Sequence, residues 1–287
     1  MIHVLSQGRF FYFRPQLLQG RKPGKENKMK KFITALAAGS MALSLAACSS
    51  SDSADAGNAD KGEAQEILIG ISPDYPPYES KNTEGDIEGF DVDMTKWLFD
   101  YLNENGHNYT YEFVELSFDT IISSLQAGQI DLGISGFTYD EDREGIFSDS
   151  YYDSAQVIIV NSGSDIKSSA DLKGKKVGAQ QGTTGESVAN TVDAADVQAI
   201  SDAKVLMENL KAEGIDAVII DKAVADSYAA NGDYTVIDEK LLDEENLIYT
   251  TEDHKELLDE INTAIKAFKE SDDYAKLTEK WFVSTNE

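Results

Sequence analysis

Segments with strand character and segments with helix character alternate from residue 66 to residue 281, and this alternation narrows the possible folds. Residues 66–71 and 109–114 have the short apolar or alternating pattern of β-strands, whereas residues 118–127 space their apolar side chains as an α-helix does. Further strands are predicted at 129–132, 156–160, 175–179, 197–200 and 217–221, and further helices after residue 89 and at 202–212, 222–230, 256–271 and 272–281. Alternation of this kind predicts an α/β fold with largely parallel sheets.

A weak internal repeat indicates two related halves. Residues 125–131 and 210–216 both contain a leucine, a turn with glycine, and an Ile-Asp pair that leads into a strand. The strand of the first half ends near Ser135, and that of the second half ends at Asp221. Ligands of open α/β sheets bind beyond the carboxyl ends of the strands. We therefore expect these two strand ends to face each other across a cleft.

The start of the chain has the pattern of an export signal. Residues 29–31 form a short basic head, and the apolar run of residues 32–47 is too short for a comfortable membrane span and ends in small residues. We interpret residues 29–47 as a signal peptide. Residues 1–28 then form an upstream extension, and residues 48–65, rich in Ser, Asp, Ala and Gly, form a flexible tether.

The only cysteine, Cys48, stands directly after the apolar run. The four residues that end with it read Leu-Ala-Ala-Cys and resemble the lipobox of bacterial lipoproteins, in which the cysteine is lipidated. The alternative is a buried structural thiol, which a polar tract immediately after the cysteine disfavours. The sequence thus predicts a lipid anchor at Cys48, a place on the extracytoplasmic face of the cell membrane, and no internal disulfide.

Acidic residues dominate the part of the chain that follows the signal. Of the 25 basic and 52 acidic residues, eight basic and one acidic lie in residues 1–47, so the remainder has a formal charge of −34. Such a charge repels nucleic acids and anionic membrane surfaces. The sequence contains no D-x-D-x-D-G loop, the pattern that would indicate a calcium site. We expect neither a metal nor a cofactor. About 220 residues remain after the tether, enough for one large domain or two lobes, and we expect a monomer.

Residues 133–143 supply several groups that a small polar ligand needs. Ser135 and Thr138 offer hydroxyls, and Gly136 allows the backbone to approach a ligand closely. Arg143 offers a planar fork that fits a carboxylate, after a helical turn that we expect to begin near Asp140. The alternative for Arg143 is a solvated ion pair with the acidic residues beside it.

Groups of complementary charge occur in the other half. Thr183 and Thr184 begin a predicted helix, where backbone N–H groups and a hydroxyl favour an anion, although an ordinary N-cap has the same sequence. Asp221 ends a strand and can bind an ammonium group, although it can also simply cap the next helix. Three aromatic residues can sandwich a ligand side chain or pack in the core: Tyr75, Tyr78 and Phe118. Together these groups complement a free amino acid.

From residue 66 to residue 281 the chain resembles the extracellular solute-binding proteins of family 3, which deliver polar amino acids to ABC importers. The segments that carry the resemblance are residues 74–78, 89–93, 118–131, 147–152, 170–178, 181–184, 215–221 and 280–282. The resemblance implies a two-lobe, periplasmic-binding-protein-like α/β fold of type II with two crossover hinge strands. It places one lobe at residues 66–152 and 246–287 and the other lobe at residues 153–245.

The resemblance also implies roles for individual residues. By motif position these are Arg143 and Thr184 for the α-carboxylate, Asp221, Ser135 and Thr138 for the amino group, and Tyr75 and Phe118 for stacking. Four further positions are candidates for side-chain specificity: Ser72, Tyr78, Gln180 and Gly185. Ser72 and Gly185 replace the acid and the longer polar residue that binders of basic amino acids often have, which disfavours arginine, lysine and histidine.

The chain departs from the family pattern in two further places. It is about two residues shorter between Arg143 and Phe147, so the turn with Arg143 is expected to be tight. The usual Tyr-Gly dipeptide is absent from residues 246–249, which leaves that crossover undefined.

The sequence therefore predicts a membrane-tethered receptor that binds a polar amino acid between two lobes and delivers it to an ABC permease. One alternative is an enzyme on the same scaffold, dehydratase-like or wall-cleaving, but a glycosidase needs two carboxyl groups across its substrate and only Asp221 is a candidate. Another is a sensor domain of a signalling protein, which would require a transmembrane helix and further domains after Trp281. A non-transport adhesin is a third.

Overall fold

The computed structural model describes residues 63–141, 143–193 and 196–282. The predicted upstream extension, the signal peptide and the lipidation residue Cys48 lie outside these ranges, as does most of the predicted tether. None of the helices formed by the described residues is long and apolar enough to cross a membrane.

A five-stranded sheet has the strand order β5-β1-β6-β14-β7. Its strands are β1 (Gln65–Ile71), β5 (Tyr109–Glu115), β6 (Leu132–Gly133), β7 (Ile146–Phe147) and β14 (Tyr249–Thr250). β1 runs parallel to β5 and β6, and β14 runs antiparallel to β6 and β7. The strand predicted at 129–132 is thus shorter than expected and begins only at Leu132.

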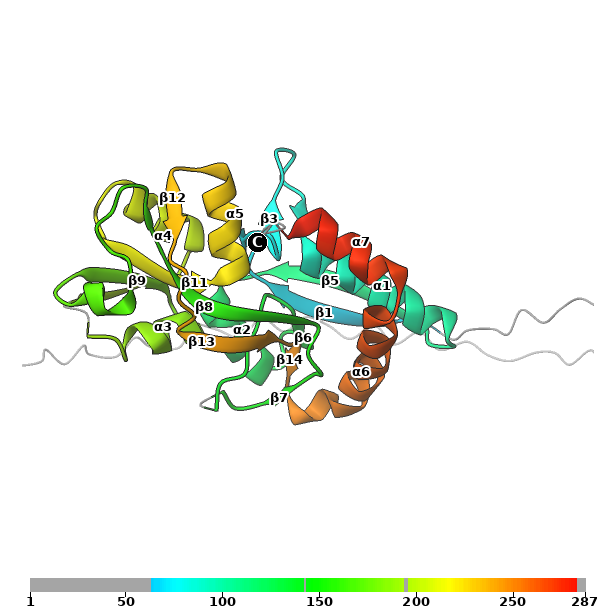
Figure 1. Cartoon of the computed structure of the whole chain (residues 1–287). Coiled ribbons are helices and arrows are strands. Elements are labelled where there is room, and N and C mark those ends of the chain that lie inside the picture. The colour runs from blue at the N-terminus through cyan, green and yellow to red at the C-terminus, as the bar shows by residue number, and fades with distance from the viewer. Residues whose placement is uncertain (1–62, 142, 194–195, 283–287) are drawn as a thin grey trace, which may run out of the picture. The chain divides into compact units, whose positions relative to one another are not determined.

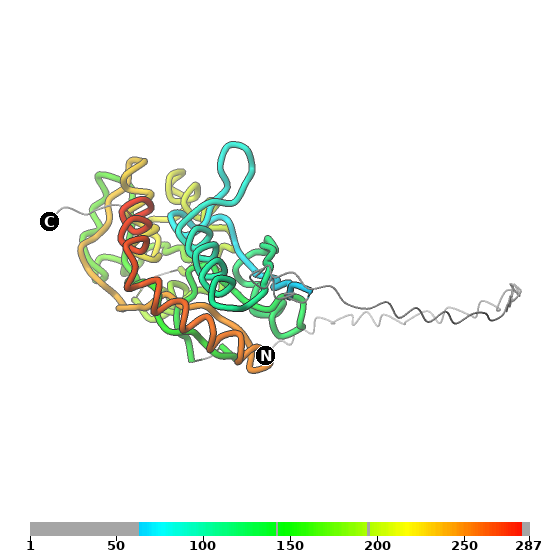
Figure 2. Tube along the Cα trace, turned by 90° about the vertical axis from the view of Figure 1, so that its right-hand side faces the viewer, coloured from blue at the N-terminus to red at the C-terminus, as the bar shows by residue number. Residues whose placement is uncertain are grey.

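Helices cover this first sheet. They are α1 (Phe90–Glu104), α2 (Phe118–Gln126), α6 (Lys255–Lys269) and α7 (Asp272–Trp281). The two C-terminal helices return to this lobe as predicted, and α1, α6 and α7 lie side by side (Figure 2). Phe268 of α6 packs against Phe90 and Trp97 of α1, with ring centroids 6.2 and 5.1 Å apart.

A small antiparallel sheet precedes α1 and fixes the start of that helix. It contains β2 (Asp74–Tyr75), β3 (Glu79–Lys81) and β4 (Ile87–Glu88). Gly89 caps α1 with φ +146°, and a Cβ atom there would lie 2.0 Å from the Tyr78 carbonyl oxygen. Only glycine fits this close approach, and the approach holds the Tyr75–Tyr78 segment against the helix.

A second, six-stranded sheet has the order β10-β9-β11-β8-β12, with β13 also paired to β8. Its strands are β8 (Tyr152–Asn161), β9 (Lys176–Gln180), β10 (Asp196–Ile200), β11 (Ala217–Asp221), β12 (Tyr234–Val236) and β13 (Leu242–Asn246). The helices of this part are α3 (Thr184–Ala189), α4 (Ala203–Lys211) and α5 (Lys222–Asn231). Short 3₁₀ helices at Ser169–Leu172 and Glu252–His254 complete the elements.

Two antiparallel strands, β8 and β13, link the two sheets (Figure 1). β8 follows β7 of the first sheet, and β13 precedes β14, so the chain passes between the sheets along this pair. Tyr152 pairs with Asn246, and Gln156 pairs with Leu242. In the stretch that the sequence left undefined, residues 246–249, β13 ends at Asn246 and β14 begins at Tyr249, with two residues outside any strand between them. The two-lobe type II fold is confirmed.

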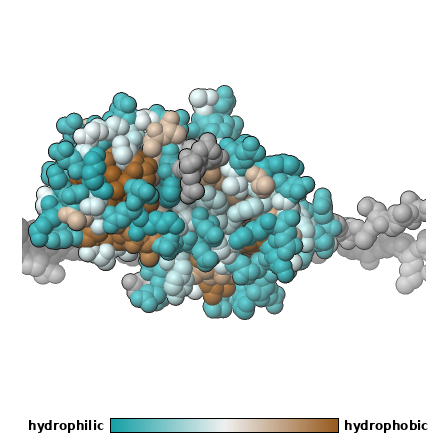
Figure 3. Space-filling view, viewed as in Figure 1, coloured by the Kyte–Doolittle hydropathy of each residue, from teal (hydrophilic) through white to brown (hydrophobic). Residues whose placement is uncertain are grey.

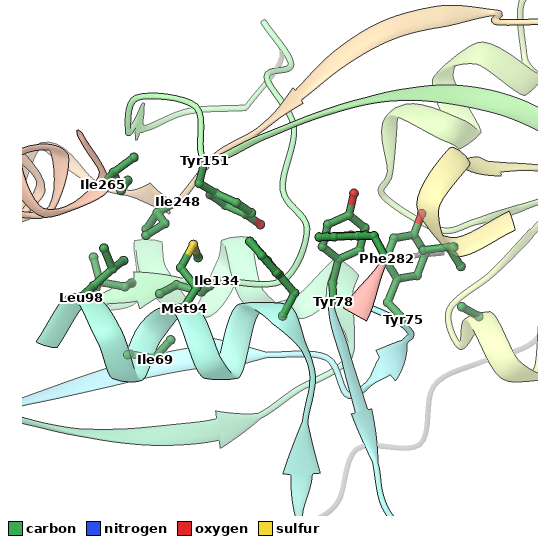
Figure 4. Packing of buried hydrophobic residues seen from close by; sticks show 14 of the residues in the cluster. Ile69, Tyr75, Tyr78, Met94, Leu98, Ile134, Tyr151, Ile248, Ile265 and Phe282 are labelled. Carbon is green, nitrogen blue, oxygen red and sulfur yellow. The ribbon is translucent and has the colours of Figure 1, made fainter. Parts of the chain in front are cut away.

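The largest hydrophobic cluster includes residues from both lobes. Ile69 and Met94 belong to it on the side of the first sheet, and Val218 and Ile220 belong to it on the side of the second. Tyr75, Tyr78, Tyr151 and Phe282 lie within the same cluster (Figure 4). In contrast, the face in Figure 3 is largely hydrophilic, as expected for the acidic composition.

Candidate functional site

Arg143 lies between the two lobes. One of its guanidinium nitrogens donates to the Thr138 carbonyl of its own lobe, and the other donates to the Gly182 carbonyl of the second lobe at 2.9 Å. The guanidinium carbon lies 5.7 Å from the Phe118 ring centroid and 5.5 Å from that of Phe137, within the range of cation–π attraction. Burial lowers the pKa of Arg143, yet arginine keeps its charge at any ordinary pH. A partly buried cation is thus held at the junction of the lobes.

The turn before Arg143 is tight, as the short spacing predicted. The Arg143 backbone N–H donates to the Asp140 carbonyl at 3.1 Å, which makes a single turn rather than a helix in the described part of this segment. Thr138 pairs with Asn246 of β13 in an isolated bridge. The arginine is therefore held close to the hinge strands.

Thr184 meets Thr138 across the lobes. Their hydroxyl oxygens are 3.0 Å apart, and both side chains are buried. Gln156 of β8 directs its amide nitrogen at the Thr184 hydroxyl, 3.4 Å away. The structure thus brings Thr138, Thr184 and Arg143 together, as the sequence predicted.

The start of α3 differs from the prediction in one respect. Thr183 is the N-cap of α3: its hydroxyl accepts from the Glu186 N–H at 3.3 Å and donates to the Gln180 carbonyl at 2.7 Å. The Gly182 N–H donates to the Glu186 carboxylate at 2.7 Å, and the Thr183 N–H donates to the Gln180 carbonyl at 3.3 Å. The prediction of free N–H groups at these two residues was therefore wrong, because groups of the same loop occupy them.

Asp221 ends β11 and caps α5, so both interpretations of this residue describe part of its environment. Its Oδ1 accepts from the Ala223 N–H at 2.8 Å and from the Tyr78 hydroxyl at 3.2 Å. Its Oδ2 is buried and has no hydrogen-bond partner within 3.5 Å among the described residues, although the nearby Ser154 hydroxyl, itself buried, opposes the rise of the pKa of Asp221. Burial raises the pKa of Asp221 to about 7. A buried carboxylate oxygen without a donor is unfavourable, and a cationic ligand would relieve this.

Ser135 and Gly136 belong to a buried network behind the cleft. The Ser135 hydroxyl donates to Glu79 at 2.8 Å and accepts from the Ser72 N–H at 3.1 Å. The Gly136 N–H donates to Asp91 at 2.9 Å. Burial and the proximity of Asp91 raise the pKa of Glu79 well above its usual range, and burial raises that of Asp91 to about 7.

Because protein groups already satisfy the Ser135 hydroxyl and the Gly136 N–H, these two residues hold the shape of the loop. The Gly136 carbonyl accepts from the Asn246 side chain at 3.3 Å, and its φ of +58° favours glycine. Sequence reasoning could not find this network, since Glu79 is 56 positions from Ser135 and Asp91 is 45 positions from Gly136.

The predicted aromatic residues line different parts of the region. Tyr75 and Tyr78 stack with ring centroids 6.2 Å apart, and Figure 4 shows both hydroxyls directed to the same side. Both reach Asp221, because the Tyr75 hydroxyl also accepts from the Asp221 N–H at 3.3 Å. Phe118 stacks on Phe137 at 4.5 Å. All three predicted aromatic residues are buried, and Tyr75 and Tyr78 both contact Asp221 of the second lobe.

The geometry agrees with what comparison with known proteins shows. Residues 67–284 match the family model described as bacterial extracellular solute-binding proteins, family 3. The chain belongs to this family. The arginine-binding extracellular protein ArtP of Bacillus subtilis is 33% identical over 88% of this chain and 98% of its own length. The histidine-binding periplasmic protein of Salmonella typhimurium is 33% identical over 76% of this chain and 88% of its own length.

Solved structures agree with these relatives. An ancestral arginine-binding protein bound to glutamine superposes with a TM-score of 0.71 at 36% identity and covers 77% of this chain and 99% of its own. ArtJ of Geobacillus stearothermophilus, an arginine-, lysine- and histidine-binding protein, has a TM-score of 0.70 at 31% identity, with coverages of 76% and 95%. As a family 3 solute-binding protein, the chain is an extracytoplasmic solute receptor of an ABC transporter rather than an enzyme.

Two of the predicted specificity positions of this family 3 protein converge on an acid that the sequence analysis missed. Ser72 donates its hydroxyl to Asp74 at 2.7 Å, and Gln180 donates its side-chain amide to the other Asp74 oxygen at 3.0 Å. Asp74 lies two residues after Ser72, so an acid is present near the position where the sequence analysis found none.

The space around residue 185 explains why a glycine is present there. A Cβ atom there would lie 2.8 Å from the Gln156 side-chain oxygen and 3.0 Å from the Ile219 carbonyl oxygen. A longer polar side chain at this position needs a different arrangement of Gln156. The close packing against Gln156 and Ile219 therefore favours glycine at position 185.

Glu244 of β13 is the second acid that the sequence analysis missed. Its Oε2 accepts from the Gln156 amide at 2.7 Å, and its Oε1 is buried without a partner in the described part of the chain. Burial raises the pKa of Glu244, and nearby hydroxyls of Thr184 and Thr138 oppose this rise. Glu244 thus adds a negative group beside the residues that surround Arg143.

Proposed function

We propose that this receptor binds the zwitterionic head of a free polar amino acid between Arg143 and Asp221. The supporting observation is the buried Oδ2 of Asp221 on the second lobe, which has no hydrogen-bond partner among the described residues, while the first lobe contributes the partly buried guanidinium of Arg143. A carboxylate on Arg143 and an ammonium group on Asp221 would neutralise both charges. Both lobes would then contact one ligand, which favours the closed form.

We assign the neighbouring residues by their positions. Thr184 and Thr138 offer hydroxyls to the ligand head, and Tyr75 and Phe118 lie where they can flank its side chain. Ser135, Gly136 and Thr183 act by holding their loops. Ser72, Tyr78, Gln180 and Gly185 remain the candidates for side-chain specificity.

The proposal names the ligand class as a polar amino acid. The relatives named above bind arginine or histidine, and an ancestral arginine-binding protein has been solved with arginine and with glutamine. A scaffold that accepts both ligands supports the class rather than one member, although Ser72 and Gly185 disfavour a basic side chain.

We further propose that the mature receptor is a monomer anchored to the cell membrane by a lipid on Cys48, with residues 48–65 as its tether. The lobe boundaries remain those of the sequence analysis: residues 66–152 and 246–287 for one lobe, and residues 153–245 for the other. From the membrane surface the receptor would deliver its amino acid to the permease subunits of the ABC importer.

A thermal-shift screen of the twenty amino acids and cystine tests this function. A ligand at 100 times its dissociation constant stabilises the folded state by about 2.7 kcal/mol, which raises the melting temperature measurably. We expect a shift with one or a few polar amino acids. Absence of a shift with every compound would contradict the proposal.

A further inference from the structure

Asp74 of β2 accepts hydrogen bonds from both lobes. The Ser72 hydroxyl donates to Oδ1 at 2.7 Å from the same loop. The Gln180 amide, at the end of β9, and the Ala203 N–H, the first of α4, donate to Oδ2 at 3.0 and 2.6 Å. The side chain is only 6% exposed. A carboxylate of one lobe is therefore bound by two donors of the other.

We propose that Asp74 is an interlobe clasp that sets ligand affinity by stabilising the closed form, without contacting the ligand. The inference rests on the ligand-binding function proposed above, because the clasp acts on the form that holds the ligand. It concerns a residue outside the set that binds the zwitterion.

The start of α4 explains why a carboxylate suits this place. The first N–H groups of a helix have no partner within the helix, and its N-terminal end attracts negative charge. Asp202, the N-cap of α4, accepts from the Val205 N–H at 2.9 Å. Asp74 accepts from the Ala203 N–H, so the helix takes one of its two capping carboxylates from the other lobe. When the lobes separate, that acceptor is lost.

The oxygens of Asp74 differ from those of Asp221, the acid proposed to bind the ligand. Both oxygens of Asp74 already accept hydrogen bonds from protein donors, whereas Asp221 keeps one buried oxygen without a partner in the described residues. Asp74 therefore needs no ligand to satisfy its carboxylate. The clasp therefore operates with any ligand.

The residues around Asp74 show that the clasp lies at the edge of the contact between the lobes. The Lys204 amine donates to the Pro73 carbonyl at 3.3 Å, a second contact between the same segments. A surface pocket of about 470 Å³ borders both, lined in part by Ser117 and Ser201. Asp74 makes no hydrogen bond to Arg143, Thr184 or Asp221 in the described part of the chain, so its loss removes no proposed contact with the ligand head.

The physical consequence is a uniform change of affinity. When only a fraction of the receptor is closed, the apparent dissociation constant rises by the inverse of that fraction for every ligand. Loss of two hydrogen bonds to a carboxylate should weaken binding by about 10- to 100-fold. The factor should be the same for arginine and for citrulline, its uncharged isostere.

The test compares Asp74→Ala with Asp202→Ala in the full chain. Asp202 caps the same helix from within its own lobe, so its removal weakens α4 without breaking an interlobe bond. Calorimetry with arginine, citrulline, glutamine and histidine should show an equal loss for all ligands that bind the wild type in Asp74→Ala. Asp202→Ala should stay within about threefold of the wild type. Asp74→Asn, which keeps the shape, should fall between them.

A second measurement does not depend on a ligand. Spin labels on Glu112→Cys and Lys173→Cys, both exposed and on different lobes, report the interlobe distance in a chain that also carries Cys48→Ser. Asp74→Ala should shift the ligand-free distance distribution to longer values, and Asp202→Ala should not. If the wild type bound none of the four amino acids, the calorimetry would use the amino acid found in the thermal-shift screen, and these distances would still test the clasp without a ligand.

Two results would overturn the inference. If Asp74→Ala weakened arginine binding and left citrulline unchanged, Asp74 would be a ligand-binding group. If neither affinity nor interlobe distance changed, the clasp would contribute nothing.

Discussion

Replacing Asp221 by asparagine should weaken ligand binding and stabilise the ligand-free protein at the same time. The substitution removes the charge and keeps the shape, and asparagine caps helices as well as aspartate does. Its Oδ1 can still accept from the Ala223 N–H, which Asp221 Oδ1 accepts at 2.8 Å. The variant should therefore fold with α5 intact.

The magnitudes follow from the environment of Asp221. Loss of one partner of a buried charged pair costs about 2–5 kcal/mol, so affinity should fall by about 30-fold or more. Burial raises the pKa of Asp221 from 3.8 to about 7, so ionising it in the folded protein costs about 4 kcal/mol at 1.36 kcal/mol per pKa unit. A raised carboxyl pKa favours the folded state below pH 3.8, and this contribution is lost as the pH rises through 7. Above pH 7 the variant should thus be the more stable protein, and at pH 4 the difference should disappear.

Calorimetry at pH 8 measures the affinity, and urea unfolding without ligand at pH 8 and pH 4 measures the stability. Asp233→Asn, at an exposed position of the same lobe, is the control and should change neither quantity. An Asp221→Asn variant with wild-type affinity would refute the assignment of the ammonium partner. A variant that is less stable than the wild type at pH 8 would refute the reasoning about its burial.

Arg143→Ala should weaken binding by about 30-fold or more in calorimetry, with Arg143→Lys between it and the wild type because lysine lacks the planar fork; equal affinities would contradict the carboxylate assignment. Wild-type affinity should be constant above pH 7.5 and should fall by up to about tenfold per pH unit below 7, as Asp221 gains a proton. A calorimetric series from pH 5 to pH 8 with no such trend would count against an ionised Asp221 in the complex. Gly185→Ala should lower the free energy of unfolding in urea by about 1–3 kcal/mol, because its Cβ would lie 2.8 Å from Gln156. A fully stable variant would show that Gln156 has room to move.

The sequence was sufficient to predict the helices and strands whose apolar residues recur at a clear helical or strand spacing. The spacing in α1, α2 and α6 defined these helices, and the apolar runs of β1 and β11 defined the strands that lead toward the site. Asp221 could be named because it ends β11, and Arg143 and Thr184 because they follow the strands β6 and β9, whose carboxyl ends lie at one edge of their sheets.

Other parts of the site depend on contacts between distant segments. β13 has the sequence Leu-Asp-Glu-Glu-Asn, whose pattern gives no sign that Glu244 and Asn246 become buried by pairing with β8. Asp74 could not be connected with α4, because Ala203 is 129 positions away. Residues with a plausible ligand role, such as Ser135, proved to be satisfied by partners that only the fold brings close.

A crystal structure of the receptor with the amino acid identified in the screen tests the central claim most directly. The account predicts the ligand carboxylate within hydrogen-bonding distance of the Arg143 guanidinium and its ammonium group within that distance of Asp221 Oδ2. An amino acid bound with the opposite polarity, or bound away from both side chains, would contradict it.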